Sequence, residues 1–455
     1  MEKNSGVNAA NAPLSFKEKL GYGLTGFGHS VWMTFLSTYI LFFYTDVAHI
    51  SPAVAGVIIS VATIWDAVND PLIAVWADNR TFRNGDRMRP YLIYASIPLA
   101  ICLVLVFTVF GTGKVTVVMA VITYLLFRVP STFYGLPIVA MRQLATENND
   151  ERVSLNTISS GTGAVGIASV STLIYALICL VAGTDADGNM LNPRLGFGFG
   201  AAFVGALVVV TSVYNYCTTK ERVHPIRQQK IGFLPACRVI LKNRSFLENL
   251  ALNFFYGTIA SLTTGYALYY CKYVVKKPSL FIPISAMYIL GVLVTLPFVS
   301  KIYKRLGRKR MMTLASLLLA AGSLLFVFFA KRAFSAFVLC FCIGVGTELI
   351  TVMLSVSKAD ITDIIERADG MRLDGMVGNV STFFQKLATA LLTALLGVVL
   401  ELAHYDADAA AQPPSAVTAI VLIMGLGGLI SAVAMGIISH VQVLDEELKR
   451  HGIER

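Results

Sequence analysis

Charged residues are scarce in this sequence of 455 residues: Asp, Glu, Lys and Arg together make up 14% of it, and 56% is hydrophobic. Soluble domains carry about a quarter charged residues and could not hide so much apolar surface from water. The scarcity excludes an ordinary soluble protein and predicts a polytopic membrane protein whose main partner is the lipid bilayer. The net charge of +10 must then be assigned loop by loop, and it does not indicate a nucleic-acid partner.

Cysteine is also sparse, and the seven residues are scattered, mostly within apolar runs. Their spacing excludes a disulfide framework and a cysteine metal site. The sequence lacks a nucleophile–base pair, a metal-ligand cluster and a phosphate-binding loop, so an enzyme is not expected. No cofactor is expected other than a coupling ion.

Apolar runs of about 20 residues, the length that crosses a bilayer as a helix, dominate the chain. Twelve such runs are found, at 20–45, 52–77, 91–111, 115–141, 155–182, 196–216, 246–271, 279–300, 311–330, 333–357, 376–402 and 415–440. The longest break between them carries seven Lys and Arg residues. The predicted organisation is an N-terminal six-helix bundle over 1–216, a cytoplasmic central loop over 217–245, and a C-terminal six-helix bundle with a short tail over 246–455.

The two halves have a similar sequence pattern: the second predicted helix of each half is followed by a short basic loop. This all-α integral membrane pattern, with twelve transmembrane helices in two six-helix pseudo-repeats, fits the major facilitator fold, in which substrate binds near the midplane between the halves. With the N-terminus inside, 28 of the 37 Lys and Arg residues fall in inner segments and seven in outer loops. The bias places both termini in the cytoplasm of a cell with a bacterial-type inner membrane. A monomer is expected.

Two carboxylates lie inside the second apolar run. Asp66 and Asp70 are four residues apart, so they share one helix face, and Asn69 flanks it. Such charges in a membrane mark an ion or substrate pathway. Like charges one turn apart need a bound cation, a shared proton or a nearby base. Na⁺ would accept Asp66 and Asp70 as metal ligands, and Asn69 and the hydroxyl of Thr132 could complete its shell.

Three more ionisable residues fall near span centres: Arg128, Glu348 and Lys386. Isolated charges at this depth are costly, so pairing is expected. Some of them could be structural ion pairs that only hold helices together.

Hydroxyl, amide and aromatic side chains on three spans suit a polyhydroxylated ligand, whose hydroxyls need partners and whose C–H faces stack on rings. Helix packing is an alternative explanation, since membrane helices use Ser and Thr for that purpose. The candidate substrate-binding residues are His29, Ser30, Trp32, Thr34, Arg128, Tyr134, Thr382, Gln385 and Lys386.

Several strings resemble the glycoside–pentoside–hexuronide:cation symporter family of the major facilitator superfamily. They are Phe42-Phe43-Tyr44-Thr45-Asp46-Val47, Trp65-Asp66-Ala67-Val68-Asn69-Asp70-Pro71, Ala359-Asp360-Ile361-Thr362-Asp363 and Phe383-Phe384-Gln385-Lys386-Leu387. The resemblance covers both halves. It implies a cation site at Asp66, Asn69, Asp70 and Thr132, with Lys386 nearby.

The departures from the family pattern concern the sites. His29-Ser30 stands where a familiar member of the family has a Lys-Asp pair, Gly135 where that member has a sugar-binding Asp, and Val139 where it has a Trp. A glycine beside the family's cation site is Arg128 in this sequence. That arginine could reach Asp66 or Asp70 as a tethered cation and weaken coupling, or it could grip a substrate carboxylate.

The predicted function is that of a secondary active transporter that imports a sugar, glycoside or hexuronide, coupled to Na⁺ or H⁺, by alternating access. The alternative is a symporter or facilitator of another organic anion, with Arg128 replacing or weakening cation coupling. A membrane sensor is disfavoured, since about 15 residues follow the last span.

Overall fold

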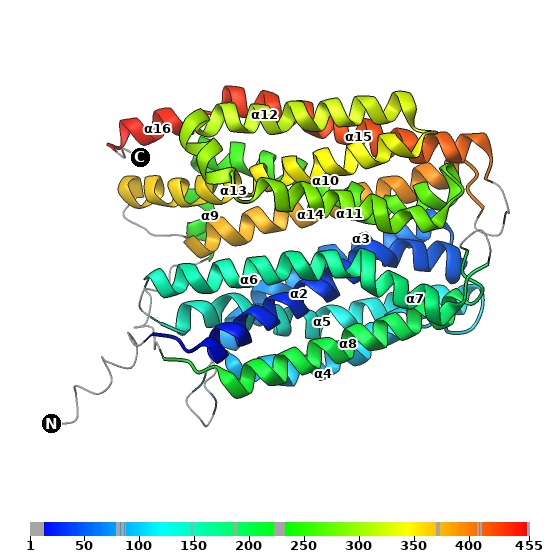
Figure 1. Cartoon of the computed structure of the whole chain (residues 1–455). Helices are drawn as coiled ribbons and strands as arrows, with labels where there is room; N and C mark the ends of the chain where they lie inside the picture. The colour runs from blue at the N-terminus through cyan, green and yellow to red at the C-terminus, as the bar shows by residue number, and fades with distance from the viewer. Residues whose placement is uncertain are drawn as a thin grey trace. The chain divides into compact units, whose positions relative to one another are not determined.

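A computed structural model describes residues 13–78, 82, 86, 88–146, 149–185, 189–222, 233–369, 374–406, 409 and 412–452. This part of the chain is almost entirely helical (Figure 1), and its extended pairing amounts to an isolated bridge between Thr184 and Met190. The chain falls into two compact units, Met1–Gln228 and Gln229–Arg455. Their boundary lies within the segment 217–245, the predicted central loop.

The first unit is a bundle of long helices, shown from blue to green in Figure 1. Its elements are α2 (Phe16–Phe42), η1 (Phe43–Val47), α3 (Pro52–Asp78), α4 (Arg89–Val106), α5 (Lys114–Leu144), α6 (Asn149–Ser169), η2 (Val170–Ile174), α7 (Tyr175–Ala182) and α8 (Pro193–Thr218). Helix α2 packs against α6 and α8, and α4 packs between α5 and α8. Helix α3 packs mainly against α5, which brings the two carboxylates of α3 to the face of α5.

The second unit has a similar succession of long helices, from green to red in Figure 1. Its elements are α9 (Phe233–Lys242), α10 (Arg244–Tyr269), η3 (Tyr270–Val274), η4 (Pro278–Leu280), α11 (Phe281–Thr295), α12 (Val299–Phe329), α13 (Ala333–Asp369), α14 (Asp374–Leu402), α15 (Pro414–Val441) and α16 (Leu444–Arg450). Helix α12 packs on α13 and α15, α11 packs on α13, and α10 packs on α14 and α15.

Nine helices in the described residues are long and apolar enough to cross a membrane. Helix α3 adds a shorter apolar stretch, Pro52–Asp66. The all-helical membrane fold is therefore observed, and the number of twelve spans in two repeats stays a prediction.

The helices that hold the first predicted span of each half, α2 and α10, end in the same local structure. Both run into a π-helical turn, η1 and η3, whose first carbonyl accepts from the N–H five residues later, at 2.9 Å in η1 and 3.1 Å in η3. A residue with positive φ follows each turn, His49 at 54° and Lys276 at 56°. A left-handed residue outside glycine is uncommon, so its recurrence at matching places is a structural sign of internal repetition.

Four parts of the second unit are more helical than predicted. Helix α12 continues through the predicted loop 301–310 with a kink at Gly307 (φ 72°), and α13 runs to Asp369, beyond the predicted span 333–357. Helices α9 and α16 form in the predicted central loop and tail. They are short and amphipathic, so their sequences contain no apolar run of membrane length.

Helix α16 is docked on the second unit by both apolar and charged contacts. Leu444 and Leu448 are buried in a cluster with Phe246, Ile361 and other apolar side chains from α9, α10, α13 and α14. Arg308 of α12 forms a buried ion pair with Asp360 of α13 and a second, 3.5 Å long, with Asp445 of α16. Helix α16 thus contacts the ends of several other helices of the second unit.

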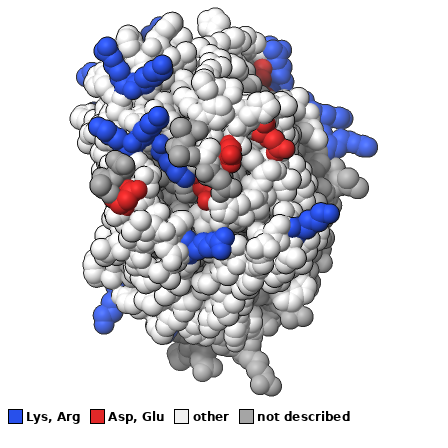
Figure 2. Space-filling view, turned by 90° about the vertical axis from the view of Figure 1, so that its right-hand side faces the viewer, with Lys and Arg blue, Asp and Glu red and all other residues white. Residues whose placement is uncertain are grey.

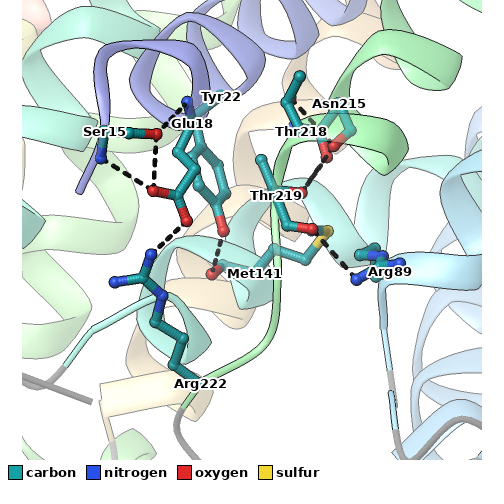
Figure 3. A network of polar contacts seen from close by, with 9 residues as sticks. All are labelled: Ser15, Glu18, Tyr22, Arg89, Met141, Asn215, Thr218, Thr219 and Arg222. Carbon is teal, nitrogen blue, oxygen red and sulfur yellow. Dashed lines mark hydrogen bonds and ion pairs between the residues drawn. The ribbon is translucent and has the colours of Figure 1, made fainter. Parts of the chain in front are cut away.

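A network of polar contacts joins helix ends in the first unit (Figure 3). Glu18, in the first turn of α2, forms a capping box with Ser15 and an ion pair with Arg222, which follows α8. Tyr22 donates to the carbonyl oxygen of Met141 in α5 at 3.4 Å. Figure 3 shows these side chains converging from the ends of α2 and α5 and from the segment after α8.

The same network fixes the start of α4. The carboxylate of Glu221 accepts from the backbone N–H groups of Met88 and Arg89, both at 2.7 Å. These donors have no partner inside the helix, and a negative charge at this end is favoured by the helix dipole. Arg89 in turn donates to the carbonyl oxygen of Thr219 at 3.1 Å. The segment that leaves α8 is therefore anchored before the central loop.

Glu18 makes the network pH-dependent. Burial by itself raises the pKa of its carboxyl group, but hydrogen bonds from Ser15 and the charge of Arg222 outweigh burial and hold that pKa below its ordinary value. A lowered folded-state pKa gives stability that is present above the unfolded-state pKa and lost as pH falls through the folded-state value.

Glu18→Gln is therefore expected to lower Tm by a few degrees at pH 7, and the difference from the unmutated protein should shrink as the buffer is acidified below the pKa of Glu18. Thermal unfolding in detergent across a pH series measures this. A Tm difference that stays constant down to acidic pH would show that the charge of Glu18 does not stabilise this network.

Figure 2 views the face that lies at the right of Figure 1. Most of the surface on this face is uncharged, and the basic side chains lie in several separate places with acidic side chains between some of them.

Candidate functional site

Two helix faces with matching polar side chains meet between α3 and α5. Residues three, four, seven and eight apart share one face of a helix, and both sets of side chains follow this spacing. The set on α3 is Thr63, Asp66 and Asp70, and the set on α5 is Tyr124, Arg128 and Thr132.

The central contact is an ion pair between Arg128 and Asp66. The Nη1 atom of Arg128 lies 2.8 Å from Oδ2 of Asp66, and the two side chains are 12% and 5% exposed. An ion pair this deeply buried holds its geometry, because separating the charges would leave each of them unpaired in a medium of low dielectric constant. Of the alternatives for Arg128, the structure shows the pairing with Asp66.

Two further side chains hold the guanidinium group of Arg128. Its Nη2 atom donates to the hydroxyl of Tyr124 at 2.7 Å, and Thr63 Oγ1 lies at 3.5 Å. The guanidinium carbon also lies 4.7 Å from the centre of the Tyr124 ring, within the range of a cation–π interaction. The sequence-based prediction did not include Tyr124 and Thr63, although their spacing from Arg128 and Asp66 placed them on the same faces.

Asp70 has a separate partner one turn along. The hydroxyl of Thr132 donates to Oδ1 of Asp70 at 2.7 Å, and it lies 3.1 Å from the carbonyl oxygen of Arg128. Asn69 is half-buried on the same helix. The four predicted cation ligands are thus on two adjacent helices, and Thr132 contacts Asp70 directly.

The donor set of Asp66, Asn69, Asp70 and Thr132 is chemically suited to Na⁺, which prefers oxygen ligands. The arrangement around Asp66 does not suit it, because a guanidinium group already contacts that carboxylate. Among the described residues no group of three or more His, Cys, Asp and Glu side chains forms a metal cluster. Na⁺ at Asp66 is therefore in conflict with the position of Arg128.

Two of the aromatic substrate candidates, His29 and Trp32, lie on α2, and the third, Tyr134, lies on α5. The ring of His29 lies 5.5 Å from that of Trp32 and 6.2 Å from that of Tyr134, and Trp32 packs edge-on against Phe127 at 5.6 Å. Tyr134 is fully buried and accepts a hydrogen bond from Ser212 at 3.3 Å. The indole N–H of Trp32 is buried with no hydrogen-bond partner among the described residues.

The two small polar candidates on α2 are Ser30, which lies at a helix contact, and Thr34. Ser30 faces α6, where a Cβ atom on Gly163 would lie 2.8 Å from its hydroxyl oxygen. Thr34 is buried, 9% exposed. Gly135, which replaces a family acid, has open space on its side, since an added Cβ would meet no atom within 4 Å. The side chain of Val139 lies outside the described residues.

The remaining candidates lie on α14 of the second unit. Thr382 is exposed and donates to the carbonyl oxygen of Gly378 at 3.0 Å, while Gln385 and Lys386 are half-buried. The backbone of Gln385 packs so closely on α10 that a Cβ on Gly257 would lie 2.4 Å from its carbonyl oxygen. Glu348, on α13, is half-buried.

The family is decided by a match along almost the whole chain. Residues 21–446 match the MFS/sugar transport protein family. The chain belongs to this family. Its members are transporters and not enzymes, so the expectation that this chain is not an enzyme is confirmed, as is the resemblance to glycoside–cation symporters.

Individual relatives agree with this family. The chain is 29% identical over 437 residues to the isoprimeverose transporter of Lactiplantibacillus pentosus, with 92% of this chain and 88% of the relative covered. It is 30% identical over 422 residues to the putative glycoside/cation symporter YagG of Escherichia coli strain K12, covering 90% and 87%. The crystal structure of a D-xylose-proton symporter is similar in fold, with TM-score 0.66, 14% identity, and 92% of this chain and 97% of that chain covered.

Proposed function

We propose that this protein is a secondary active transporter that carries a sugar or glycoside across the cell membrane by alternating access. The observation that carries the proposal is the family match over residues 21–446. The relatives described above, named for isoprimeverose and for glycoside–cation symport, support this substrate class. The buried indole N–H of Trp32 supports it too, because a substrate hydroxyl would supply the missing acceptor.

Import, coupling to Na⁺ or H⁺, cytoplasmic termini and a monomeric state are the finer parts of the proposal. Ion coupling rests on the two acids of α3, and the cytoplasmic termini rest on the excess of Lys and Arg in the predicted inner loops. The alternative is transport of an organic anion that binds to Arg128. It has less support, because the guanidinium of Arg128 is already paired with Asp66 and hydrogen-bonded to Tyr124.

Substrate counterflow in proteoliposomes tests the substrate class without needing an ion gradient. Vesicles preloaded with unlabelled xylose, xylosides, hexosides or hexuronides should take up the matching labelled compound transiently above its equilibrium level. Counterflow of hexuronides alone would favour the anion alternative. An absence of counterflow with every sugar would contradict the proposed function.

Asp70→Asn is expected to abolish uphill accumulation while counterflow persists. The substitution removes the charge but keeps an oxygen that can accept from Thr132, so the helix contact survives and the coupling charge does not. Accumulation driven by Na⁺ or pH gradients measures the effect. Asp185→Asn, in an exposed segment between α7 and α8, is the matched control and should accumulate normally; full accumulation by Asp70→Asn would exclude Asp70 from coupling.

A further inference from the structure

Arg128 occupies a position built by several side chains. The carboxylate of Asp66, the hydroxyl of Tyr124 and the ring face of Tyr124 all contact its guanidinium group, and the Thr63 hydroxyl is at the limit of hydrogen-bond distance. A planar group with five donors suits such a set of acceptors better than an ammonium group does. The two helix faces therefore match an arginine in this one place.

The positive charge of this group is permanent. An arginine side chain does not lose its proton in proteins, and this one is 12% exposed, so little water screens it. Asp66, Asp70 and Arg128 together leave one negative charge, the same balance that two carboxylates and a bound Na⁺ would give.

We propose that Arg128 is a resident cation that takes the place of a mobile sodium ion at Asp66, and that Tyr124 is the residue that positions it. On this basis the unmutated protein does not bind Na⁺ between α3 and α5. A small neutral residue at position 128 converts the same oxygen ligands, Asp66, Asp70, Asn69 and Thr132, into a sodium site. The inference rests on the proposed function and specifies how its cation site works.

Electrostatic repulsion gives the size of the effect. A second unit charge about 4 Å from the guanidinium, at the effective dielectric constant of about 20 that suits such sites, weakens sodium binding on the order of a thousandfold. The guanidinium also fills coordination space at Asp66, which adds to the exclusion.

Sodium binding to the purified full-length protein tests the proposal directly. Thermal unfolding in detergent is measured in a series of NaCl concentrations, with choline chloride keeping ionic strength constant. The unmutated protein should show no sodium-specific rise in Tm. A saturable rise at millimolar Na⁺ that is lost in Asp66→Asn would overturn the proposal.

Arg128→Ala is the converse variant. In choline chloride it should unfold at a lower temperature than the unmutated protein, because Asp66 is left without its cation. Na⁺ should restore Tm, and the rise should saturate at concentrations that leave the Tm of the unmutated protein unchanged. Adding Asp70→Asn to Arg128→Ala should remove the response, and Arg128→Lys, which keeps a charge, should not acquire it. A folded Arg128→Ala protein whose Tm does not change with Na⁺ concentration would contradict the proposal.

Tyr124→Phe tests the positioning role. It keeps the ring under the guanidinium and removes the hydroxyl, so the guanidinium can leave Asp66 for part of the time. A weak sodium-dependent rise in Tm is expected, which loss of packing alone would not produce. If Arg128→Ala does not fold, this variant and the sodium series on the unmutated protein still decide the question.

The two proposals fail separately. Sodium-driven uptake of a sugar by the unmutated protein would leave the transport function standing and overturn the role of Arg128. An unmutated protein that neither binds Na⁺ nor moves any sugar, beside an Arg128→Ala variant that binds Na⁺, would keep the resident cation and overturn the sugar substrate.

Discussion

Replacing Asp66 by Asn is expected to lower the free energy of unfolding by about 3–5 kcal/mol, the usual cost of removing one partner from a buried ion pair. The reason is that Arg128, 12% exposed, keeps its charge and has little access to water. The hydroxyl of Tyr124 remains as a neutral acceptor and does not compensate the charge. Chemical denaturation in detergent, followed by intrinsic fluorescence, measures the loss.

A double-mutant cycle separates the ion pair from general packing. Arg128→Met combined with Asp66→Asn removes both charges and keeps similar volumes, so it should recover most of the stability that the Asp66→Asn change loses. Arg244→Gln is the control, because Arg244 pairs with Glu248 while 63% exposed, and its loss should cost less than about 1 kcal/mol. Additive losses in the cycle would show that the two side chains do not interact energetically.

Gly344→Ala is expected to destabilise the second unit by about 3 kcal/mol. A Cβ atom at this position in α13 would lie 2.1 Å from the carbonyl oxygen of Tyr288 in α11. Gly291 of α11 lies at the same helix contact, and a Cβ atom added to it would lie 2.5 Å from the carbonyl oxygen of Phe341 in α13. Both contacts are with backbone, which cannot swing away, so the two helices would have to separate.

Gly378→Ala is the matched control in the same unit. An added Cβ at Gly378 in α14 meets no atom within 4 Å, and alanine has the higher helix propensity, so stability should be unchanged or rise by up to about 1 kcal/mol. Tm and yield in detergent compare the two variants. Equal behaviour of Gly344→Ala and Gly378→Ala would show that the close crossing of α11 and α13 is not needed for stability.

Some of the site could be predicted because helix periodicity is a local property. The spacing of Asp66, Asn69 and Asp70 placed them on one stretch of helix, and Thr132 was expected to complete a cation shell with them; the structure brings the Thr132 hydroxyl to Asp70. Tyr124 and Thr63 follow the same spacing, but neither is ionisable at neutral pH, so neither stands out as a charge within an apolar run.

Other features needed contacts across the fold. The docking of α16 depends on Leu444 and Leu448 meeting residues from four other helices, and its seven residues are too few for a membrane-length pattern. Likewise, Ser30 was a substrate candidate by composition, but in the structure it lies at the contact between α2 and α6, where small residues let helices approach closely.

The sequence by itself determined the class of protein, because so few charges and so many long apolar runs suit only a chain solvated by lipid. It also determined the family and the placement of two acids on one face of a membrane helix. Only the tertiary structure decided what Arg128 does. A long side chain on α5 could have reached either acid or faced elsewhere, and the choice depends on how α5 is rotated against α3. That rotation sets Tyr124, Arg128 and Thr132 opposite Thr63, Asp66 and Asp70, so the arginine pairs with the first acid and the threonine with the second.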